Sequence, residues 1–109
     1  MNGASDPHRM LGAAIAARFA PAHVELREGK RVPWFSATFS GMRHHYDLVV
    51  RGEGAQTAAA RFVSEIKHDD IEMRGHLLAD IDLVRADVVS GVPAPMVMLG
   101  IDALTVAVR

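Results

Sequence analysis

The C-terminal segment constrains the fold of this chain more than any other part of the sequence. Residues 96–108 are almost wholly apolar and rich in valine and leucine, and Asp102 is their only charged residue. This composition is typical of a central strand that is buried on both faces, and Gly100 marks a position where a bulge can form. Because such a strand needs partners on each side and cover above and below, we expect it to lie at the centre of a layered sheet fold.

Two segments carry the periodicity of amphipathic helices. In residues 7–20 apolar side chains recur at four-residue intervals, Asp6 is a suitable N-cap, and Pro7 suits the first helical position. Residues 55–66 repeat the pattern and include consecutive alanines that allow close packing on a sheet. Residues 1–5 are small and polar, so we expect a frayed start before the first helix.

Alternating apolar and polar residues predict strands in the rest of the chain. Residues 22–51 have the pattern of a three-stranded antiparallel meander, with turns at residues 28–30 and 40–41. Residues 76–86 fit a strand or a helix, and we prefer a strand because the C-terminal strand needs a partner. Residues 88–95 contain a glycine and two prolines, so we expect a loop there.

The predicted architecture is an α+β domain in which two helices pack on a five-stranded, mainly antiparallel sheet, in the order α-β-β-β-α-β-β. The length of 109 residues fits a single domain over residues 1–109. Two helices cover only one face of such a sheet, and we expect Leu78, Val84 and Ala86 to lie on the uncovered face. That face is predicted to be a dimer interface or one wall of a ligand pocket.

Composition and charge argue against several classes of protein. The 12 basic and 13 acidic residues give a net charge of −1, without the basic excess that is usual in nucleic-acid binding. The chain has no cysteine and therefore no disulfide, thiol nucleophile or cysteine-ligated cofactor. No apolar run reaches the roughly 18 residues that a membrane-spanning helix needs. We expect a cytoplasmic protein that binds neither nucleic acid nor membranes and carries no cofactor.

The N-terminal half partly resembles two known patterns, and neither resemblance identifies a family or a function. Its first apolar run and residues 20–22 resemble a secretory signal peptide, but Asp6 and Arg18 do not fit that pattern, and an amphipathic helix is preferred. The opening order α-β-β-β-α is similar to that of double-stranded RNA-binding domains. Those domains bind phosphates with a lysine-rich start of the second helix, whereas residues 55–60 here are uncharged.

Aromatic residues and histidines on the predicted strands are the main candidates for ligand binding. Trp34, His44 and Tyr46 are expected near a pocket between the sheet and the helices. His44 and His45 are adjacent in a strand, so their side chains point to opposite faces and do not bind one metal ion together. We expect His44 to face the core and His45 to face solvent.

Acidic residues are the candidates for a metal site or an acid–base pair. Asp80 and Asp82 lie on one face of their predicted strand, and a hairpin formed by the last two strands can bring Asp102 opposite Asp80. Such like charges need relief from a metal ion, a basic side chain, a raised pKa or solvent. A second group of titratable residues, between His68 and His76, lacks the spacing of known metal motifs.

No catalytic motif is present, so the sequence does not identify a function. The preferred hypothesis is a non-catalytic module that self-associates as a homodimer through the uncovered sheet face or an edge strand. The alternatives are a small-ligand-binding domain with a pocket between sheet and helices, and a metal-assisted enzyme that uses an Asp/His cluster.

Overall fold

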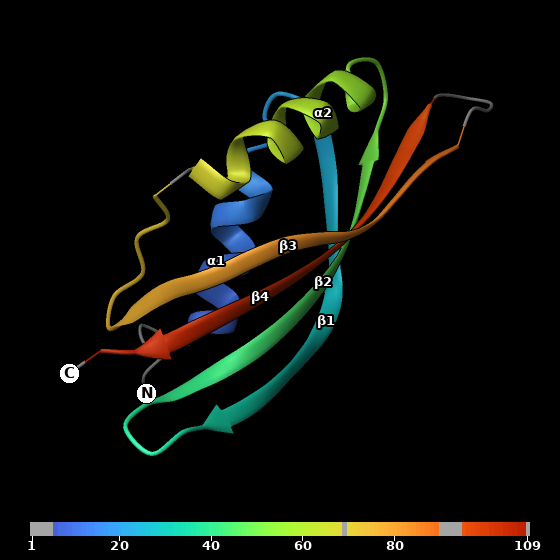
Figure 1. The fold of residues 1–109 in the computed structure, drawn as a ribbon. Coiled ribbons are helices and arrows are strands. Elements are labelled where there is room, and N and C mark those ends of the chain that lie inside the picture. Colours follow the sequence, from blue (N-terminus) through green and yellow to red (C-terminus); the bar gives the residue numbers. More distant parts are fainter. Residues whose placement is uncertain (1–5, 69, 90–94, 109) are drawn as a thin grey trace.

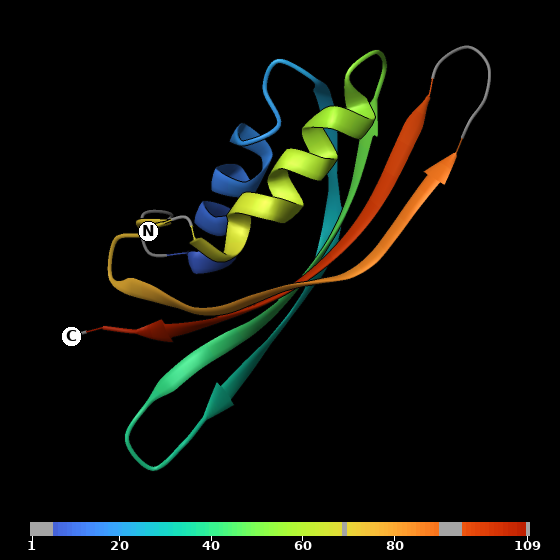
Figure 2. The ribbon, with the colours of Figure 1, turned by 45° about the horizontal axis from the view of Figure 1, so that its top comes forward.

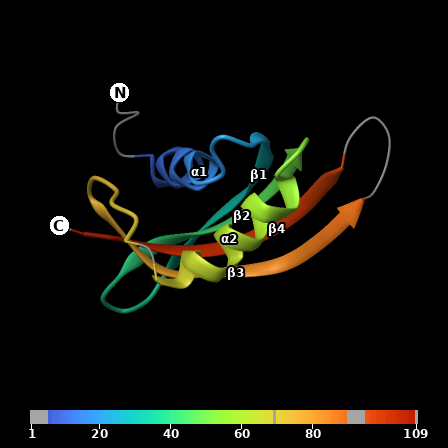
Figure 3. The same ribbon diagram turned by 90° about the horizontal axis from the view of Figure 1, so that it is seen from above.

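The structure, a computed structural model, describes residues 6–68, 70–89 and 95–108, except for the side chain of residue 28. Two helices lie side by side on one face of an antiparallel sheet, so the chain has the predicted α+β fold (Figure 1, Figure 3). The elements in chain order are α1 (Pro7–Ala17), β1 (His23–Phe35), β2 (Ser40–Arg51), α2 (Ala55–Glu65), the short 3-10 helix η2 (Ile66–His68), β3 (His76–Val89) and β4 (Met96–Ala107). The predicted frayed start and residues 90–94 of the predicted loop lie outside the described residues.

Helix α1 begins where the sequence predicts. The Asp6 carboxylate accepts hydrogen bonds from the backbone N–H groups of His8 and Arg9, at 3.1 and 3.3 Å, and Pro7 occupies the first helical position. The helix ends at Ala17, before the predicted limit of residue 20. None of the described helices is both long and apolar enough to cross a membrane.

Strand β1 joins the first two strand segments that the sequence predicts. The predicted turn at residues 28–30 is instead a bulge, because the pairing of β1 with β2 shifts register between Arg27 and Lys30 and then continues to Phe35. The five predicted segments therefore occur in the predicted order, and the first two form one continuous strand. The sheet has four hydrogen-bonded strands in the order β1-β2-β4-β3.

The core lies between the helices and the side of the sheet that faces them (Figure 2). The rings of Phe19, which follows α1, and Phe62 of α2 stack with their centroids 4.7 Å apart. The central strands contribute alternate residues to this core: Tyr46, Leu48, Val50, Val97, Leu99 and Ile101. Because alternate residues of a strand share a face, this pattern also identifies which side chains of β2 and β4 point away from the helices.

Strand β3 contains two bulges that change which of its residues face the helices. Its pairing with β4 shifts register at Ala79 and again at Val84. Each bulge adds one unpaired residue, so the alternation of faces restarts after it. Leu78 packs against the core and Ala86 faces α2, which corrects the expectation that they lie on the uncovered face. Val84 itself is exposed.

The other face of the sheet has no second layer within the described residues (Figure 3). Strand β4 is buried on its helix side, whereas Met98, Leu104 and Val106 on its other side are half-buried and Asp102 is exposed. The prediction that the C-terminal strand is central is confirmed, and the chain itself covers one of the two faces. The expectation that this strand is buried on both faces is not met within the described residues, because nothing among them covers its second face.

Candidate functional site

The uncovered face of the sheet has an apolar end and a charged middle. Residues that are partners across neighbouring strands share a face, so the register places the residues of this face in rows that cross the four strands. The two rows nearest the β1–β2 hairpin hold five apolar side chains, named here the apolar end: Val32, Trp34, Leu77, Leu104 and Val106. Val32 is 57 % exposed and Leu77 is 61 % exposed. A surface cluster of this kind is typical of an interaction site.

The indole of Trp34 bridges three strands of this end. It extends from β1 over Gly41 of β2, and its Nε1–H donates to the carbonyl oxygen of Thr105 on β4, at 3.3 Å. A side chain at Gly41 would collide with the indole and with the Thr105 oxygen, so glycine permits this close approach. The turn predicted at residues 40–41 lies instead at residues 36–39.

The charged residues of the uncovered face are divided by sign. The part formed by β1 and β2 is named here the basic half, and the part formed by β4 and β3 the acidic half. In the basic half, the carboxylates Glu25 and Asp47 are outnumbered by basic side chains, which are Arg27, Lys30, Arg43 and Arg51. In the acidic half, the one basic side chain, Arg85, is outnumbered by carboxylates, which are Asp80, Asp82, Asp87 and Asp102.

His45 connects the two halves. Its Nδ1 lies 2.6 Å from Asp102 Oδ1, and its Nε2 lies 3.0 Å from Asp47 Oδ1. The hydrogen bond to Asp102, followed by that to Asp47, favours the imidazolium and raises the pKa of His45 above its usual value of 6.5. Because both ring nitrogens are occupied, His45 joins strands rather than serving as a general base. The prediction that His44 and His45 point to opposite faces is confirmed.

The acidic side chains of β3 bind Lys67, which reaches them from η2. Lys67 Nζ lies 2.5 Å from Asp82 Oδ1 and 3.4 Å from Asp80 Oδ1, and it lowers the pKa of the Asp82 carboxyl. The cross-strand partner of Asp102 is Asp82, and not Asp80 as predicted. The point at which β3 and β4 begin to pair, together with the bulge at Val84, sets this register. Lys67 binds Asp80 and Asp82 and His45 binds Asp102, so these two side chains offset the repulsion between the carboxylates. The described residues contain no group of three or more His, Asp or Glu side chains that could hold a metal ion.

A buried chain of hydrogen bonds on the helix side links α1 to β2 and β4. His44 is 2 % exposed, and its Nε2 lies 2.9 Å from Thr105 Oγ1. Its Nδ1 lies 2.9 Å from Nδ1 of His8 on α1. The Tyr46 hydroxyl donates to the His8 carbonyl oxygen at 2.6 Å, and burial raises the pKa of this phenol. The rings of His8, His44 and Tyr46 are stacked.

Both ring nitrogens of His44 are hydrogen-bonded, and the tautomers of His44 and His8 set which partner donates in each bond. Thr105 Oγ1 also lies 3.5 Å from the Met42 carbonyl oxygen. Burial, and next the charge of His8, lowers the pKa of His44 to about 4. The neutral ring of His44 holds the helix to the sheet, and neither of its nitrogens is available to a substrate.

The predicted ligand-binding residues lie on two sides of the sheet. His44 and Tyr46 are together on the helix side, whereas Trp34 belongs to the uncovered face. Sequence reasoning missed His8, which is 36 positions from His44. No pattern in the sequence marks this contact, because it depends on how α1 docks against the sheet.

An apolar groove lies between α2 and the outer strand β3. It has a volume of about 440 Å³, and Gln56 and Ser64 are its polar lining residues. Its other lining residues are Ala59, Ala60, Val63, Leu83, Ala86, Val88, Val97 and Leu99. A pocket between sheet and helix is therefore present, with a lining that includes none of the three predicted ligand-binding residues.

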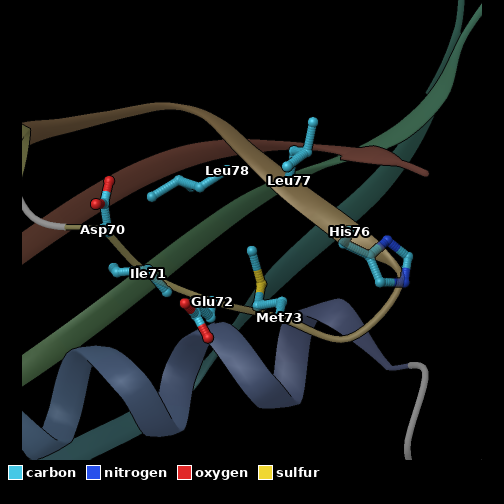
Figure 4. A pocket seen from close by; sticks show the side chains of 7 residues that line it. All are labelled: Asp70, Ile71, Glu72, Met73, His76, Leu77 and Leu78. Atoms are coloured by element: carbon cyan, nitrogen blue, oxygen red, sulfur yellow. The ribbon is translucent and has the colours of Figure 1, made fainter.

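A second hollow, of about 460 Å³, lies between residues 70–73 and the start of β3 (Figure 4). Its lining includes Asp70, Glu72 and His76 from the titratable group that the sequence singles out, together with apolar side chains such as Leu78. These titratable residues line an open wall and do not form a convergent group of metal ligands.

Comparisons with known proteins identify no relative of this chain. No protein-family model, no curated protein and no solved structure matches it.

Proposed function

We propose that this chain is a non-catalytic module that forms a homodimer through the uncovered face of its sheet. The observation that carries the proposal is the apolar end, where five apolar side chains gather on a face that no other described part of the chain covers. Val32 and Leu77 are more than half exposed, and Trp34 is partly exposed. Their removal from water on association would be favourable.

A second copy of the same surface is the simplest cover for this patch. Two-fold homodimers use one self-complementary patch on both subunits. Tryptophan is enriched at such interfaces because its ring contributes a large apolar area. The apolar end would form the centre of the interface, and the charged rows beside it would form part of a polar rim.

We propose no catalytic step for this chain. We also propose that it is located in the cytoplasm. Hydrogen bonds occupy both ring nitrogens of His44 and of His45, the histidines whose pKa values are shifted. The location is supported only by the sequence, which has no cysteine. Cell fractionation of the tagged chain tests it, and recovery outside the cytoplasm would contradict it.

Sedimentation equilibrium tests the dimer. We expect the wild-type chain to be dimeric in the micromolar range and Leu77→Asp to be monomeric, because an interface does not accommodate an unpaired buried charge. Val88→Asp is the matched control, since Val88 is 58 % exposed on the same strand but lines the groove on the helix side. A monomeric wild type, or a Leu77→Asp variant that dimerises normally, would contradict the proposal.

The groove between α2 and β3 favours a second candidate function, the binding of a small apolar ligand. Its volume of about 440 Å³ and mostly apolar lining resemble those of ligand sites, which span about 300–1,000 Å³. Gln56 and Ser64 are available to orient a polar group of the ligand.

Titration with a medium-chain fatty acid and with an apolar fluorescent dye tests this second function. Ala60→Leu fills part of the groove and is expected to remove most of the binding. Ala13→Leu is the control, because it makes the same change at an exposed position of α1 outside the groove. The absence of saturable binding to the wild-type chain would exclude this function.

A further inference from the structure

The hairpin that joins β1 to β2 projects beyond the two helices (Figure 1, Figure 2). Residues 35–39, named here the hairpin tip, are all exposed. Phe35, at the end of β1, is 76 % exposed, and Phe39, in the turn, is 56 % exposed. Both phenylalanines lie outside the core, and exposed aromatic side chains gathered at a projecting tip are typical of a surface that contacts a partner.

The turn at the hairpin tip forms hydrogen bonds within itself. The backbone N–H of Ser36 donates to the carbonyl oxygen of Phe39 at 2.8 Å, and the backbone N–H of Phe39 donates to the Ser36 hydroxyl oxygen at 3.0 Å. Backbone groups that already have partners cost less to remove from water than groups that have none. These bonds therefore lower the cost of placing the hairpin tip in a less polar medium.

Basic side chains lie behind the hairpin tip, on the strands that carry it. Residues 29–46 include Lys30, Arg31 and Arg43 but no aspartate or glutamate, and these three basic residues are exposed. Arg31 binds Asp6, whereas Lys30 and Arg43 form no ion pair with the described residues. The hairpin thus combines an apolar tip with positive charge that its own strands do not neutralise.

We propose that the hairpin tip inserts into the surface of a membrane that contains anionic lipids. Phenylalanine enters the boundary between headgroups and acyl chains, tryptophan is enriched at this boundary, and lysine and arginine attract anionic headgroups. The cytoplasmic leaflet is anionic, so it is the surface that we propose for a cytoplasmic protein. This inference goes beyond the proposed homodimer and does not depend on it.

Contact of this kind needs no membrane-spanning segment. The expectation that the chain does not bind membranes rested on the length of its apolar runs, which is the criterion for a spanning helix. Attachment at the interface instead requires a few apolar side chains with basic residues beside them. The hairpin supplies both, so the proposal replaces that expectation for contact at the membrane surface.

The spacing along the hairpin fits the depth of the membrane interface. Phe39 precedes Arg43 by four residues, and Phe35 follows Arg31 by four residues. Since a strand rises about 3.3 Å per residue, the cations lie at most roughly 13 Å behind the phenylalanines. Interfacial segments bury their apolar side chains about 5–10 Å deep, and long basic side chains extend toward the headgroups. Both phenylalanines therefore enter the boundary while Lys30 and Arg43 remain at the headgroups.

Co-sedimentation with lipid vesicles tests the binding. We expect the wild-type chain to bind vesicles made of phosphatidylcholine and phosphatidylserine in equal parts, and to bind pure phosphatidylcholine vesicles at least about tenfold more weakly. Salt should release the bound chain, because it screens the attraction between the cations and the headgroups. Equal binding to the two kinds of vesicle, or binding to neither, would overturn the proposal.

Substitutions separate the apolar contribution from the electrostatic one. Phe39→Ser is expected to weaken binding about tenfold through the loss of an inserted ring, and Arg43→Gln about fivefold through the loss of one cation. Val84→Ser and Arg61→Gln are the matched controls, because both positions are exposed and neither belongs to the hairpin. Losses of the same size in the controls would show that the hairpin is not the contact.

Trp34 reports insertion directly, since it is the only tryptophan and pairs with Gly41 next to the hairpin tip. Its emission should shift to shorter wavelength on binding, and lipids brominated on their acyl chains should quench it. Binding without quenching would overturn insertion.

Sedimentation of the double variant Phe35→Ser/Phe39→Ser distinguishes a membrane from a second copy of the chain as the partner of the hairpin tip. The apolar end contains neither residue, so the double variant is expected to associate in solution to the same extent as the wild type while its vesicle binding is lost. If the double variant loses self-association instead, the hairpin tip belongs to a contact between copies and the membrane proposal is wrong. A wild type that binds vesicles but is monomeric in solution would overturn the homodimer alone.

Discussion

His8 Nδ1 lies 2.9 Å from His44 Nδ1, so a hydrogen bond joins an imidazole on α1 to an imidazole on β2 across the interface between helix and sheet. Thr105 occupies the remaining nitrogen of His44, and Tyr46 binds the carbonyl group of His8. Burial, and next the charge of His8, lowers the pKa of His44 to about 4, so the ring is neutral at neutral pH.

Acid is expected to destabilise the fold through His44. The unfolded chain binds a proton at this residue near pH 6.5, whereas burial and then His8 hold the pKa of His44 at about 4 in the fold. The charge of Asp6 raises this pKa, and the charges of Arg31 and His76 lower it. As the pH falls between these two values the unfolded state gains the proton first, so the free energy of unfolding decreases by about 3 kcal/mol.

Urea denaturation between about pH 7 and pH 4 measures this loss of stability. The His44→Gln variant is expected to lose its share of the pH dependence. His45 acts in the opposite direction: its raised pKa adds stability that is complete below pH 6.5 and is lost as the pH rises through its value in the fold. NMR titration separates the two rings, and a His44 that titrates near 6.5 in the folded chain would contradict the assignment.

Tyr46→Phe is expected to destabilise the chain by about 1–2 kcal/mol, because the His8 carbonyl oxygen loses the hydroxyl that donates to it. Tyr46 is 1 % exposed, and phenylalanine retains the ring that stacks on His8. The comparison of urea unfolding curves for the two chains measures the difference. An unchanged midpoint would show that this hydrogen bond contributes nothing.

Gly41→Ala is expected to displace the indole of Trp34 and to weaken its hydrogen bond to Thr105, because the added methyl group collides with both. Trp34 is the only tryptophan, so its fluorescence should shift to longer wavelength as the ring becomes more exposed. Ser40→Ala, at the neighbouring exposed position, is the control. A wild-type spectrum for Gly41→Ala would place the ring elsewhere.

Lys67→Met is expected to lower the free energy of unfolding only slightly, because its ion pairs with Asp80 and Asp82 are exposed to solvent. Thermal unfolding measures the effect. Since Lys67 already binds both carboxylates, we also expect divalent metal ions to leave the melting temperature of the wild-type chain unchanged. A clear rise in the presence of excess metal ion would contradict this view of the acidic residues.

The uncovered face was predictable only in outline. Two helices cover one side of a sheet, and Trp34 alternates with the residues of its strand that face the helices, so an exposed face with an aromatic ring follows from the sequence. The list of residues that form the apolar end does not follow from the sequence, because only the register of three strand pairs brings Leu77 and Leu104 near Trp34. The bulges of β3 also reversed the expected faces of Leu78 and Ala86, since a bulge depends on pairing rather than on local composition.

The sequence by itself determined the cap of α1, the two helices, the strand segments and the central position of β4, because these depend on local backbone preferences and on short periodicities. Only the tertiary structure decided that His8 binds His44, that Lys67 forms an ion pair with Asp82, and that the basic and acidic halves are separated. Each of these arrangements joins residues distant in sequence, and each depends on strand register or on the docking of one element against another.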